Sequence, residues 1–499
     1  MTVFVLVSGP FTGGWVWQEV AERLRAAGAE ALPVALTGMV DGPPGGPETD
    51  LETHVADVLR AIDGIGGGDD GVGGADAAEV VLVGHDYGIH PVLGAADRRP
   101  ERVARVVYLD AGLPMDGDAA LALVPEGTVE RDGFVAPPSG EGWGRWGSVE
   151  GIPADALARL DRLSAPQPAR TLTQPLRLAG SPFDRPSTGV LCTANGSGIA
   201  MVELLVASGP PVFRALADPR VGFIELATGH WPMLSAPGEL AAALSRAAAD
   251  EGHRVAAPEH ARPADPGAFL LDVPERARVR EGRVDLHLPD GEGPRPAVLF
   301  VHGGPVAPDQ RPTPRDSPTL LGYARYLAGL GVVGATLDHR LHGLADYPVS
   351  AGDLAEAVEC LRADPRVDGD RIALWFLSGG GLLSADWLAA PPPWLRAVAL
   401  SCPVLAPPRS WRAVHSRFRP VAAVTEASPP IVLIRAGLEH EMFATGVEEF
   451  LTAAARAGAG IDLIDAPLAH HGFETLDHTP ETRAAVTRAA RSVLGHLES

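Results

Sequence analysis

Short runs of apolar residues recur along the first half of the chain, and segments with helical spacing separate them. The runs are rich in β-branched residues, which predicts strands buried on both faces of a parallel sheet. The strands predicted in this way are Val3–Val7, Ala31–Leu36, Val80–Val83, Val103–Leu109, Gly189–Thr193 and Val221–Leu226. Between them, Leu51, Val55 and Leu59 fall on one face of a helix predicted over residues 50–62. This alternation predicts an α/β domain over residues 1–249.

The alternation begins again after residues 250–268, a polar segment with three prolines and no periodicity that we interpret as a linker. Residues 269–499 therefore predict a second α/β domain, which opens with a short antiparallel segment at 269–288. Its further predicted strands are Ala297–Val301, Val332–Leu337, the strand entered at Arg371, Ala397–Leu400 and Ile431–Arg435, the last of which completes the sheet.

Two segments, about 114–186 and about 405–428, lack this alternation, and each is predicted to form a cap over the edge of its sheet. A glycine-rich run at 64–74 predicts a surface loop, because no helix with a basic residue follows that could hold a phosphate. The predicted fold class is therefore α/β, with two consecutive domains. Each domain is expected to be a mostly parallel sheet flanked by helices and covered by a cap.

Composition narrows the class of function. The net charge of −22 argues against nucleic acid or an anionic membrane as a partner. The chain has no apolar run near the ~18 residues of a membrane span and begins with a strand, not a signal sequence, so we expect a cytoplasmic protein. All 41 cations are arginine, which excludes a Schiff-base lysine. The three cysteines are widely spaced, and we expect no metal, no cofactor and a small-molecule substrate. The oligomeric state is left open.

Two strand–turn–helix segments carry the candidate chemistry. In the first half, Gly84-His85-Asp86-Tyr87-Gly88 has the spacing of the nucleophile elbow G-x-S-x-G, but an aspartate occupies the position of the serine. In the second half, the elbow is Phe376-Leu377-Ser378-Gly379-Gly380, which carries the serine but replaces the first glycine with Phe376. The sequence therefore contains two elbows with two kinds of nucleophile.

The second half resembles α/β-hydrolases of the esterase, dienelactone hydrolase and prolyl-oligopeptidase-like group. The segments that carry the resemblance are His302-Gly303-Gly304, Asp338-His339-Arg340-Leu341, Val367–Ile372, the serine elbow and His471-Gly472-Phe473. The resemblance implies a hydrolase in which Ser378 is the nucleophile, Glu439 the orienting acid and His471 the base, in the chain order of that fold. Glu441 is a rival for the acid. Gly304 and Gly379 are the expected oxyanion donors.

The first half resembles a different branch, the plant-type methyl esterases and hydroxynitrile lyases. The resemblance rests on Gly13–Trp17, Leu36-Thr37-Gly38 and Gly229–Leu234. The segment Cys192–Gly196, where that branch places its acid, has no carboxylate. Asp86 and Tyr108-Leu109-Asp110-Ala111 are instead similar to haloalkane dehalogenases and epoxide hydrolases. That likeness implies Asp86, Asp110 and His230 as nucleophile, orienting acid and base.

Three features argue against covalent catalysis by Asp86. Tyr87 replaces the tryptophan that dehalogenases place after the nucleophile, and the predicted cap contains no tyrosine. Pro10 stands where a backbone N–H should complete the oxyanion hole, and proline has none. Asp86 could still serve as a general acid or base, or be a relic in a domain that no longer catalyses.

The sequence therefore predicts a hydrolase that cleaves an ester, lactone or related acyl bond at Ser378. One alternative makes the first domain the catalyst, as a lyase, dehydratase or epoxide-opening enzyme that uses Asp86 and His230. Another makes both halves a non-catalytic binding module. The sequence does not indicate the substrate.

Overall fold

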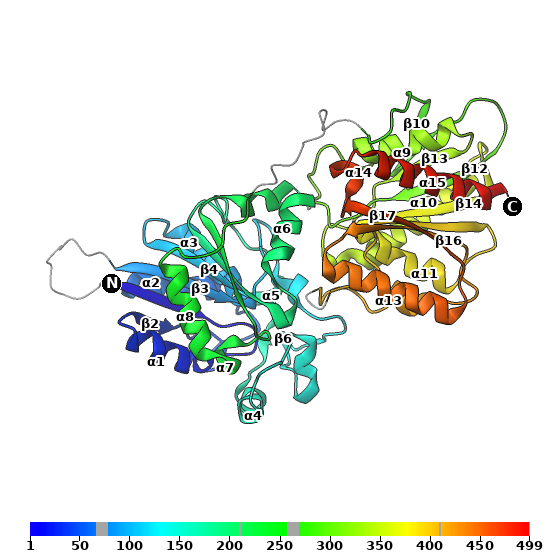
Figure 1. Cartoon of the computed structure of the whole chain (residues 1–499). Helices are drawn as coiled ribbons and strands as arrows, with labels where there is room; N and C mark the ends of the chain where they lie inside the picture. Colours follow the sequence, from blue (N-terminus) through cyan, green and yellow to red (C-terminus); the bar gives the residue numbers. More distant parts are fainter. Residues whose placement is uncertain (66–77, 209–210, 257–268, 409–410, 499) are drawn as a thin grey trace. The chain divides into compact units, whose positions relative to one another are not determined.

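A computed structural model describes residues 1–65, 78–208, 211–256, 269–408 and 411–498 of the chain (Figure 1). The chain divides into two compact units, one made of Met1–Val206 with Pro211–Ala257 and the other of Ala207–Pro210 with Pro258–Ser499. Most of the glycine-rich run at 64–74, and residues 257–268 of the predicted linker, lie outside the described residues.

The first unit contains a six-stranded parallel sheet with the strand order β2-β1-β3-β4-β8-β9. Its strands are β1 (Thr2–Val7), β2 (Glu30–Pro33), β3 (Glu79–His85), β4 (Val103–Leu109), β8 (Ser187–Cys192) and β9 (Val221–Leu226). The helices are α1 (Gln18–Ala26), α2 (Leu51–Gly64), α3 (Ile89–Arg98), α4 (Ala154–Leu163), α5 (Ala169–Thr173), α6 (Ile199–Ser208), α7 (Pro232–Ser235) and α8 (Pro237–Ala248). Helix α2 begins at a capping box of Asp50 with Thr53.

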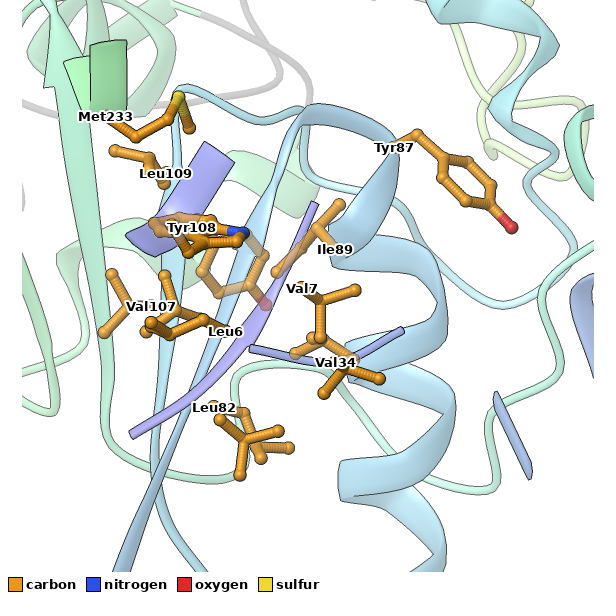
Figure 2. Packing of buried hydrophobic residues seen from close by; sticks show 14 of the residues in the cluster. Leu6, Val7, Val34, Leu82, Tyr87, Ile89, Val107, Tyr108, Leu109 and Met233 are labelled. Carbon is orange, nitrogen blue, oxygen red and sulfur yellow. The ribbon is translucent and has the colours of Figure 1, made fainter. Parts of the chain in front are cut away.

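The central strands of this unit are buried because apolar residues point to both faces of the sheet. In β3, Val80, Val81, Leu82 and Val83 are fully buried. Figure 2 shows Leu82 in the packed cluster that also contains Leu6 and Val7 of β1 and Val107 of β4. The first elbow therefore rises from a rigid, close-packed strand.

The predicted linker begins later than the sequence indicates. Residues 250–256 belong to the first unit, where His253 pairs with Phe223 of β9. Val255 is buried against the same strand. These contacts hold residues 250–256 against β9, although the polar sequence of this segment has no helical or strand periodicity that would predict it.

Between β4 and β8, the chain forms the segment predicted as a cap. It contains a small antiparallel sheet of β5 (Glu130–Arg131), β6 (Phe134–Val135) and β7 (Gln167–Pro168), together with α4 and α5. A 3-10 helix, η4 (Gly140–Arg145), lies in the same segment.

The second unit contains an eight-stranded sheet with the order β10-β11-β13-β12-β14-β15-β16-β17. Its strands are β10 (Arg278–Glu281), β11 (Val284–His287), β12 (Arg295–Val301), β13 (Val333–Leu337), β14 (Val367–Leu377), β15 (Leu395–Ser401), β16 (Ile431–Leu438) and β17 (Ile461–His470). The helices are α9 (Pro318–Gly329), α10 (Tyr347–Ala363), α11 (Ser384–Ala389), α12 (Pro420–Ala423), α13 (Glu441–Ala457), α14 (Phe473–Leu476) and α15 (Pro480–Glu498). As predicted, β10 and β11 are antiparallel.

One strand of this sheet was not predicted. The strand at Ile431 does not complete the sheet, because β17 pairs with β16 in parallel and forms the edge. Its sequence contains Asp462, Asp465 and Pro467, which weaken a strand pattern but are tolerated at an edge, where one side of the backbone has no strand partner.

The two sheets share one topology. The order β2-β1-β3-β4-β8-β9 in the first unit corresponds strand by strand to β13-β12-β14-β15-β16-β17 in the second. The predicted fold class, two α/β-hydrolase-type units, is therefore confirmed. The carboxyl ends of these strands form one edge in each sheet, and this is the edge where ligands bind in such folds.

Candidate active site

Both elbows hold their central residue in a left-handed backbone conformation. The φ angle is 47° at Asp86 and 48° at Ser378. Such a conformation is uncommon for residues other than glycine, and it lifts the side chain above the end of the strand. Strained backbone of this kind persists only where the surrounding structure enforces it.

Glycines make the first turn possible. A Cβ atom on Gly84 would lie 2.5 Å from the Cα atom of Ile89, and one on Gly88 would lie 2.7 Å from the carbonyl oxygen of Ser8. In the second elbow, a Cβ atom on Gly380 would lie 2.5 Å from the carbonyl oxygen of His302. Gly88 and Gly380 therefore allow the same close approach between the elbow and the end of the neighbouring strand.

The second elbow accommodates Phe376 where the first has Gly84. Its chain continues as a six-residue 3-10 helix, η9 (Ser378–Leu383), whereas the 3-10 turn of the first elbow, η2 (Asp86–Gly88), lasts three residues. The 3-10 conformation rises about 2.0 Å per residue, against about 1.5 Å in an α-helix. The side chain of Phe376 is fully buried at this position.

In the second unit, three predicted side chains form one hydrogen-bonded chain. The Oγ atom of Ser378 lies 2.7 Å from Nε2 of His471, and Nδ1 of His471 lies 2.7 Å from Oε2 of Glu439. The other carboxylate oxygen of Glu439 accepts a hydrogen bond from the backbone N–H of His440 at 2.8 Å. Glu441, the rival acid, is exposed at the start of α13. The arrangement can polarise the Ser378 hydroxyl through a histidine of fixed tautomer.

The predicted oxyanion residues lie beside this serine. A Cβ atom on Gly379 would approach the carbonyl oxygen of Gly304 to 2.5 Å, so the two backbones are in contact. The N–H of Gly304 donates to no acceptor within the described ranges. The sequence did not indicate Tyr347, whose hydroxyl donates to the carbonyl oxygen of Gly379 at 3.0 Å and so holds the Gly379–Gly380 peptide.

In the first unit, the structure also brings together the three predicted side chains. The Nε2 atom of His230 lies 2.8 Å from Oδ2 of Asp86, and its Nδ1 atom lies 2.6 Å from Oδ2 of Asp110. All three side chains are at least 98% buried, with exposures of 1% for His230, 2% for Asp86 and 1% for Asp110. Ser378 of the second unit, by contrast, is partly exposed.

The charges of this buried group decide its chemistry. Burial by itself lowers the pKa of His230, but the carboxylates of Asp86 and Asp110 outweigh burial and hold that pKa above its usual value. His230 can therefore donate an N–H to each carboxylate. The two carboxylates thus favour the protonated form of His230, whereas the base of a serine or covalent aspartate hydrolase must accept a proton.

Asp110 takes the place of the acid that is missing after β8. At that place Asn195 donates from Nδ2 to Oδ2 of Asp110 at 2.7 Å, and its Nδ2 atom lies 3.3 Å from Nδ1 of His230. Ser197 donates a further hydrogen bond to Asp110 at 2.9 Å. The sequence showed that a carboxylate was absent here, but it gave no sign that Asn195 and Ser197 would hold the replacement.

The oxyanion loop of the first unit offers no free N–H at Pro10 or Phe11. Pro10 lacks an N–H, and the N–H of Phe11 donates to Oε1 of Gln167, a buried residue of the cap, at 3.2 Å. Gln167 was not singled out by the sequence, because a single glutamine in a segment without periodicity carries no motif.

The cap also closes directly over His230. A Cβ atom on Gly147 would lie 2.4 Å from the Cβ and Cγ atoms of His230, and the N–H of His230 donates to the carbonyl of Ser148 at 2.7 Å. The indole of Trp231 packs edge-on against the His230 ring, 4.7 Å between centroids. The first site is therefore sealed by backbone and aromatic contacts.

Cys402 is the counterpart of Asp110 in the second unit. Each residue follows the equivalent strand, β15 or β4, with φ near 40° (35° for Cys402 and 42° for Asp110). The N–H of Gly472 donates to Sγ of Cys402 at 3.4 Å, and the Cys402 thiol lies 3.8 Å from Oε2 of Glu474. Burial raises the pKa of Cys402, so this position holds a neutral group.

No group of three metal-ligating side chains occurs in the part of the chain that the structure describes. Among the same residues, no helix is both long and apolar enough to cross a membrane.

In each unit, an elbow residue, a histidine and a carboxylate meet at the carboxyl edge of the sheet. The site is sealed in the first unit and partly exposed in the second. This arrangement is typical of a hydrolase fold. A model of the alpha/beta hydrolase family matches residues 4–243. The carbendazim hydrolyzing esterase of Nocardioides sp. (strain SG-4G) is 31% identical over 266 residues, which is 49% of this chain and 99% of that protein. The chain belongs to the alpha/beta hydrolase family.

Other similar proteins cover less of their own length or are more distant. Esterase PIR7B of Oryza sativa subsp. japonica is 34% identical over 116 residues, 23% of this chain and 40% of that protein. Among solved structures, the methylesterase MES16 from Arabidopsis is 20% identical with a TM-score of 0.39, covering 50% of this chain and 100% of that one.

Proposed function

We propose that this protein is an esterase-type hydrolase that cleaves an ester, lactone or related acyl bond of a small molecule at Ser378. The observation that carries the proposal is the chain of two 2.7 Å contacts from Ser378 through His471 to Glu439, with Ser378 partly exposed. The esterases among the relatives support the same class of reaction.

The proposed reaction follows from the hydrogen bonds. His471 holds its Nδ1–H on Glu439, so Nε2 accepts the proton of Ser378 as Oγ attacks the carbonyl carbon. The N–H groups of Gly304 and Gly379 stabilise the negative oxygen of the tetrahedral intermediate. His471 then returns the proton to the leaving alcohol, and water attacks the acyl group on Ser378 by the same route. These steps need no metal and no cofactor.

An aromatic group beside the site supports a small, partly apolar substrate. Phe443 lies 5.2 Å from the ring of His471, and Trp411 lies 6.0 Å from Phe443, both measured between centroids. Apolar side chains with a few placed polar groups are typical of small-molecule sites.

Labelling with a fluorophosphonate, followed by peptide mapping of the full chain, tests this proposal. We expect one label, on Ser378, and loss of aryl-ester hydrolysis in parallel with labelling. The matched variant Asp86→Asn should label as the wild type does. Hydrolysis that survives complete labelling of Ser378, or an active protein that takes no label, would contradict the proposal.

The second candidate function places catalysis in the first unit. The contacts of His230 with Asp86 and Asp110 favour proton transfer, as in a lyase, a dehydratase or epoxide opening. A covalent route through Asp86 is disfavoured, because neither Pro10 nor Phe11 offers an oxyanion donor. The discriminating observation is an activity that survives Ser378→Ala and is lost in His230→Gln.

A further inference from the structure

A buried carboxyl group, Glu474, lies three residues after His471 in helix α14. Its Oε1 atom accepts a hydrogen bond from the hydroxyl of Tyr323 at 3.1 Å, and its Oε2 atom accepts one from the thiol of Cys402 at 3.8 Å. Among the described residues, Glu474 forms no ion pair. Burial raises the pKa of Glu474, which favours its uncharged form. The proposed reaction at Ser378 does not use this acid.

Tyr323 ties Glu474 to the core of the second unit. The Tyr323 ring, on α9, contacts Phe300 of β12 and Trp375 of β14, with centroids 5.0 and 5.2 Å apart. Tyr323 is fully buried and belongs to the same hydrophobic cluster as Cys402. Because such an interior is close-packed, the Tyr323 hydroxyl is a donor of fixed position.

Cys402 connects Glu474 to the loop that carries the histidine. Its sulfur accepts a hydrogen bond from the backbone N–H of Gly472 at 3.4 Å, while its thiol donates to Glu474. That N–H belongs to the peptide directly after His471. Gly472 has a φ of 71°, in a region where glycine is conformationally free, so the peptide needs an external contact to hold it. Glu474 and Cys402 together supply that contact.

The charge of Glu474 matters because a second carboxyl group lies near the same thiol. Burial raises the pKa of Cys402, and the carboxyl groups of Glu474 and Glu439 raise it further. Glu439 already provides the negative charge that faces His471. An ionised Glu474 would add a second, repelling charge in a buried region, whereas its uncharged form keeps the hydrogen bonds without that cost.

We propose that Glu474 and Cys402 are positioning residues that hold the peptide after His471 through an uncharged hydrogen-bonded link and so keep the His471 ring between Ser378 and Glu439. This inference rests on the proposed role of Ser378. The ring spans two contacts of 2.7 Å, and a displacement of about 1 Å can lower a rate roughly 100-fold. Both side chains act through the backbone of the loop.

The first unit holds its histidine in a different way. Met233, the second residue of α7, occupies the position of Glu474, three residues after His230, and is buried. Asp110 occupies the position of Cys402 and contacts the His230 ring directly. The first unit therefore places a carboxylate on the ring at the position from which the second unit places a thiol on the loop.

Two matched pairs of substitutions test the link. Glu474→Leu and Cys402→Ala break it, and we expect each to lower kcat for an aryl ester roughly 100-fold, with KM changed less than about threefold. Glu474→Gln and Cys402→Ser keep polar atoms in place without a charge and should retain kcat within about tenfold of the wild type. The double variant with Leu and Ala should lose no more than about twofold beyond either single variant, because both break the same link.

Two further readouts on the full chain separate positioning from packing. The acid limb of the pH profile of kcat/KM should be unchanged in Glu474→Gln. Loss of an ionised carboxylate would disfavour the protonated imidazole of His471 and move that limb to lower pH. Thermal unfolding should not follow the order of kcat, since Leu is an apolar side chain in an apolar cluster.

The outcomes also separate this inference from the proposed function. Wild-type kcat in Cys402→Ala or Glu474→Leu would overturn the link alone, provided that Ser378 still takes the fluorophosphonate label. Additive losses in the double variant, or an acid limb shifted to lower pH in Glu474→Gln, would also overturn it. Full turnover by Ser378→Ala would overturn the proposed function and this inference together.

Discussion

The Oδ2 atom of Asp110 lies 2.6 Å from Nδ1 of His230, although Asp110 follows β4 and not β8. In the second unit, the carboxylate that meets the corresponding histidine, Glu439, follows β16, the counterpart of β8. The two units therefore hold equivalent histidines with acids from different strands. This is possible because the carboxyl ends of neighbouring parallel strands meet at one edge of the sheet.

Replacing the serine should separate the two units functionally. We expect Ser378→Ala to lower kcat/KM for small aryl esters by several orders of magnitude, because the acyl-enzyme can no longer form. Its matched control is Asp86→Asn, which changes the same elbow position in the first unit and should leave this activity within a factor of about two. Steady-state kinetics of the folded variants measure both effects. Unchanged turnover in Ser378→Ala would remove the assignment of the nucleophile.

The acid of the second unit can be tested with two neighbouring carboxylates. Glu439→Gln should lower kcat roughly 10³–10⁴-fold, since the amide no longer stabilises the His471 imidazolium. Glu441→Gln should be close to the wild type, because Glu441 is exposed and begins α13. Equal effects of the two substitutions on kcat would show that Glu439 is not the orienting acid.

Asp86 should form no covalent ester with substrate. A leaving halide would find no indole N–H at Tyr87 and an opening epoxide would find no tyrosine in the cap, so the step that forms the ester is unsupported. Pro10 has no N–H and the N–H of Phe11 donates to Gln167, so release of such an ester would be slowed as well. We expect no mass shift on the peptide that contains Asp86 after incubation with alkyl halides and epoxides. The variant His230→Gln, in which release would be blocked, should give the same result. An adduct in that variant, or heavy oxygen from solvent in Asp86 after turnover, would establish the covalent route.

Because the pKa of His230 is raised, the stability of the first unit should depend on pH. The folded pKa lies above that of the unfolded chain, which is about 6.5, so the folded state binds the proton more tightly. The stabilisation is complete below about pH 6.5 and is lost as pH rises through the folded pKa. Calorimetry of the full chain should therefore show that the unfolding temperature of the first unit decreases as the pH rises through the folded pKa of His230. His230→Gln should remove this dependence and destabilise the unit by about 3–5 kcal/mol.

A carboxylate swap provides the control for that measurement. In the double variant Asp110→Asn with Asn195→Asp, a carboxylate remains within reach of Nδ1 of His230, because Nδ2 of Asn195 lies 3.3 Å from it. The swap should restore much of the stability that Asp110→Asn alone removes. It should also restore the loss of stability with rising pH, which we call the alkaline decline. An alkaline decline that persists in His230→Gln would show that another group is responsible.

The local sequence pattern determined the fold class, the division into two units and the turns that carry the candidate nucleophiles. The β-branched run before Gly84 and the alternation of strands with helices predicted the α/β class and two consecutive units. The spacing of the elbow predicted the turns at Asp86 and Ser378, because only a narrow set of residues permits such a close approach of backbones. The order Ser378, Glu439, His471 followed from the resemblance to serine hydrolases, and the structure brings these side chains together.

The tertiary structure determined which of the candidate polar side chains contact each other. Asp110 reaches His230 across 120 residues of sequence only because β4, β8 and β9 are neighbours in the sheet. The edge strand β17, the stacking of His302 on His339 and the hold of Gln167 on Phe11 likewise depend on contacts between distant segments. A local pattern reports how a residue fits its own strand or helix. Which partner a polar side chain meets at the edge of a sheet is set by the order of the strands, and no single segment carries that information.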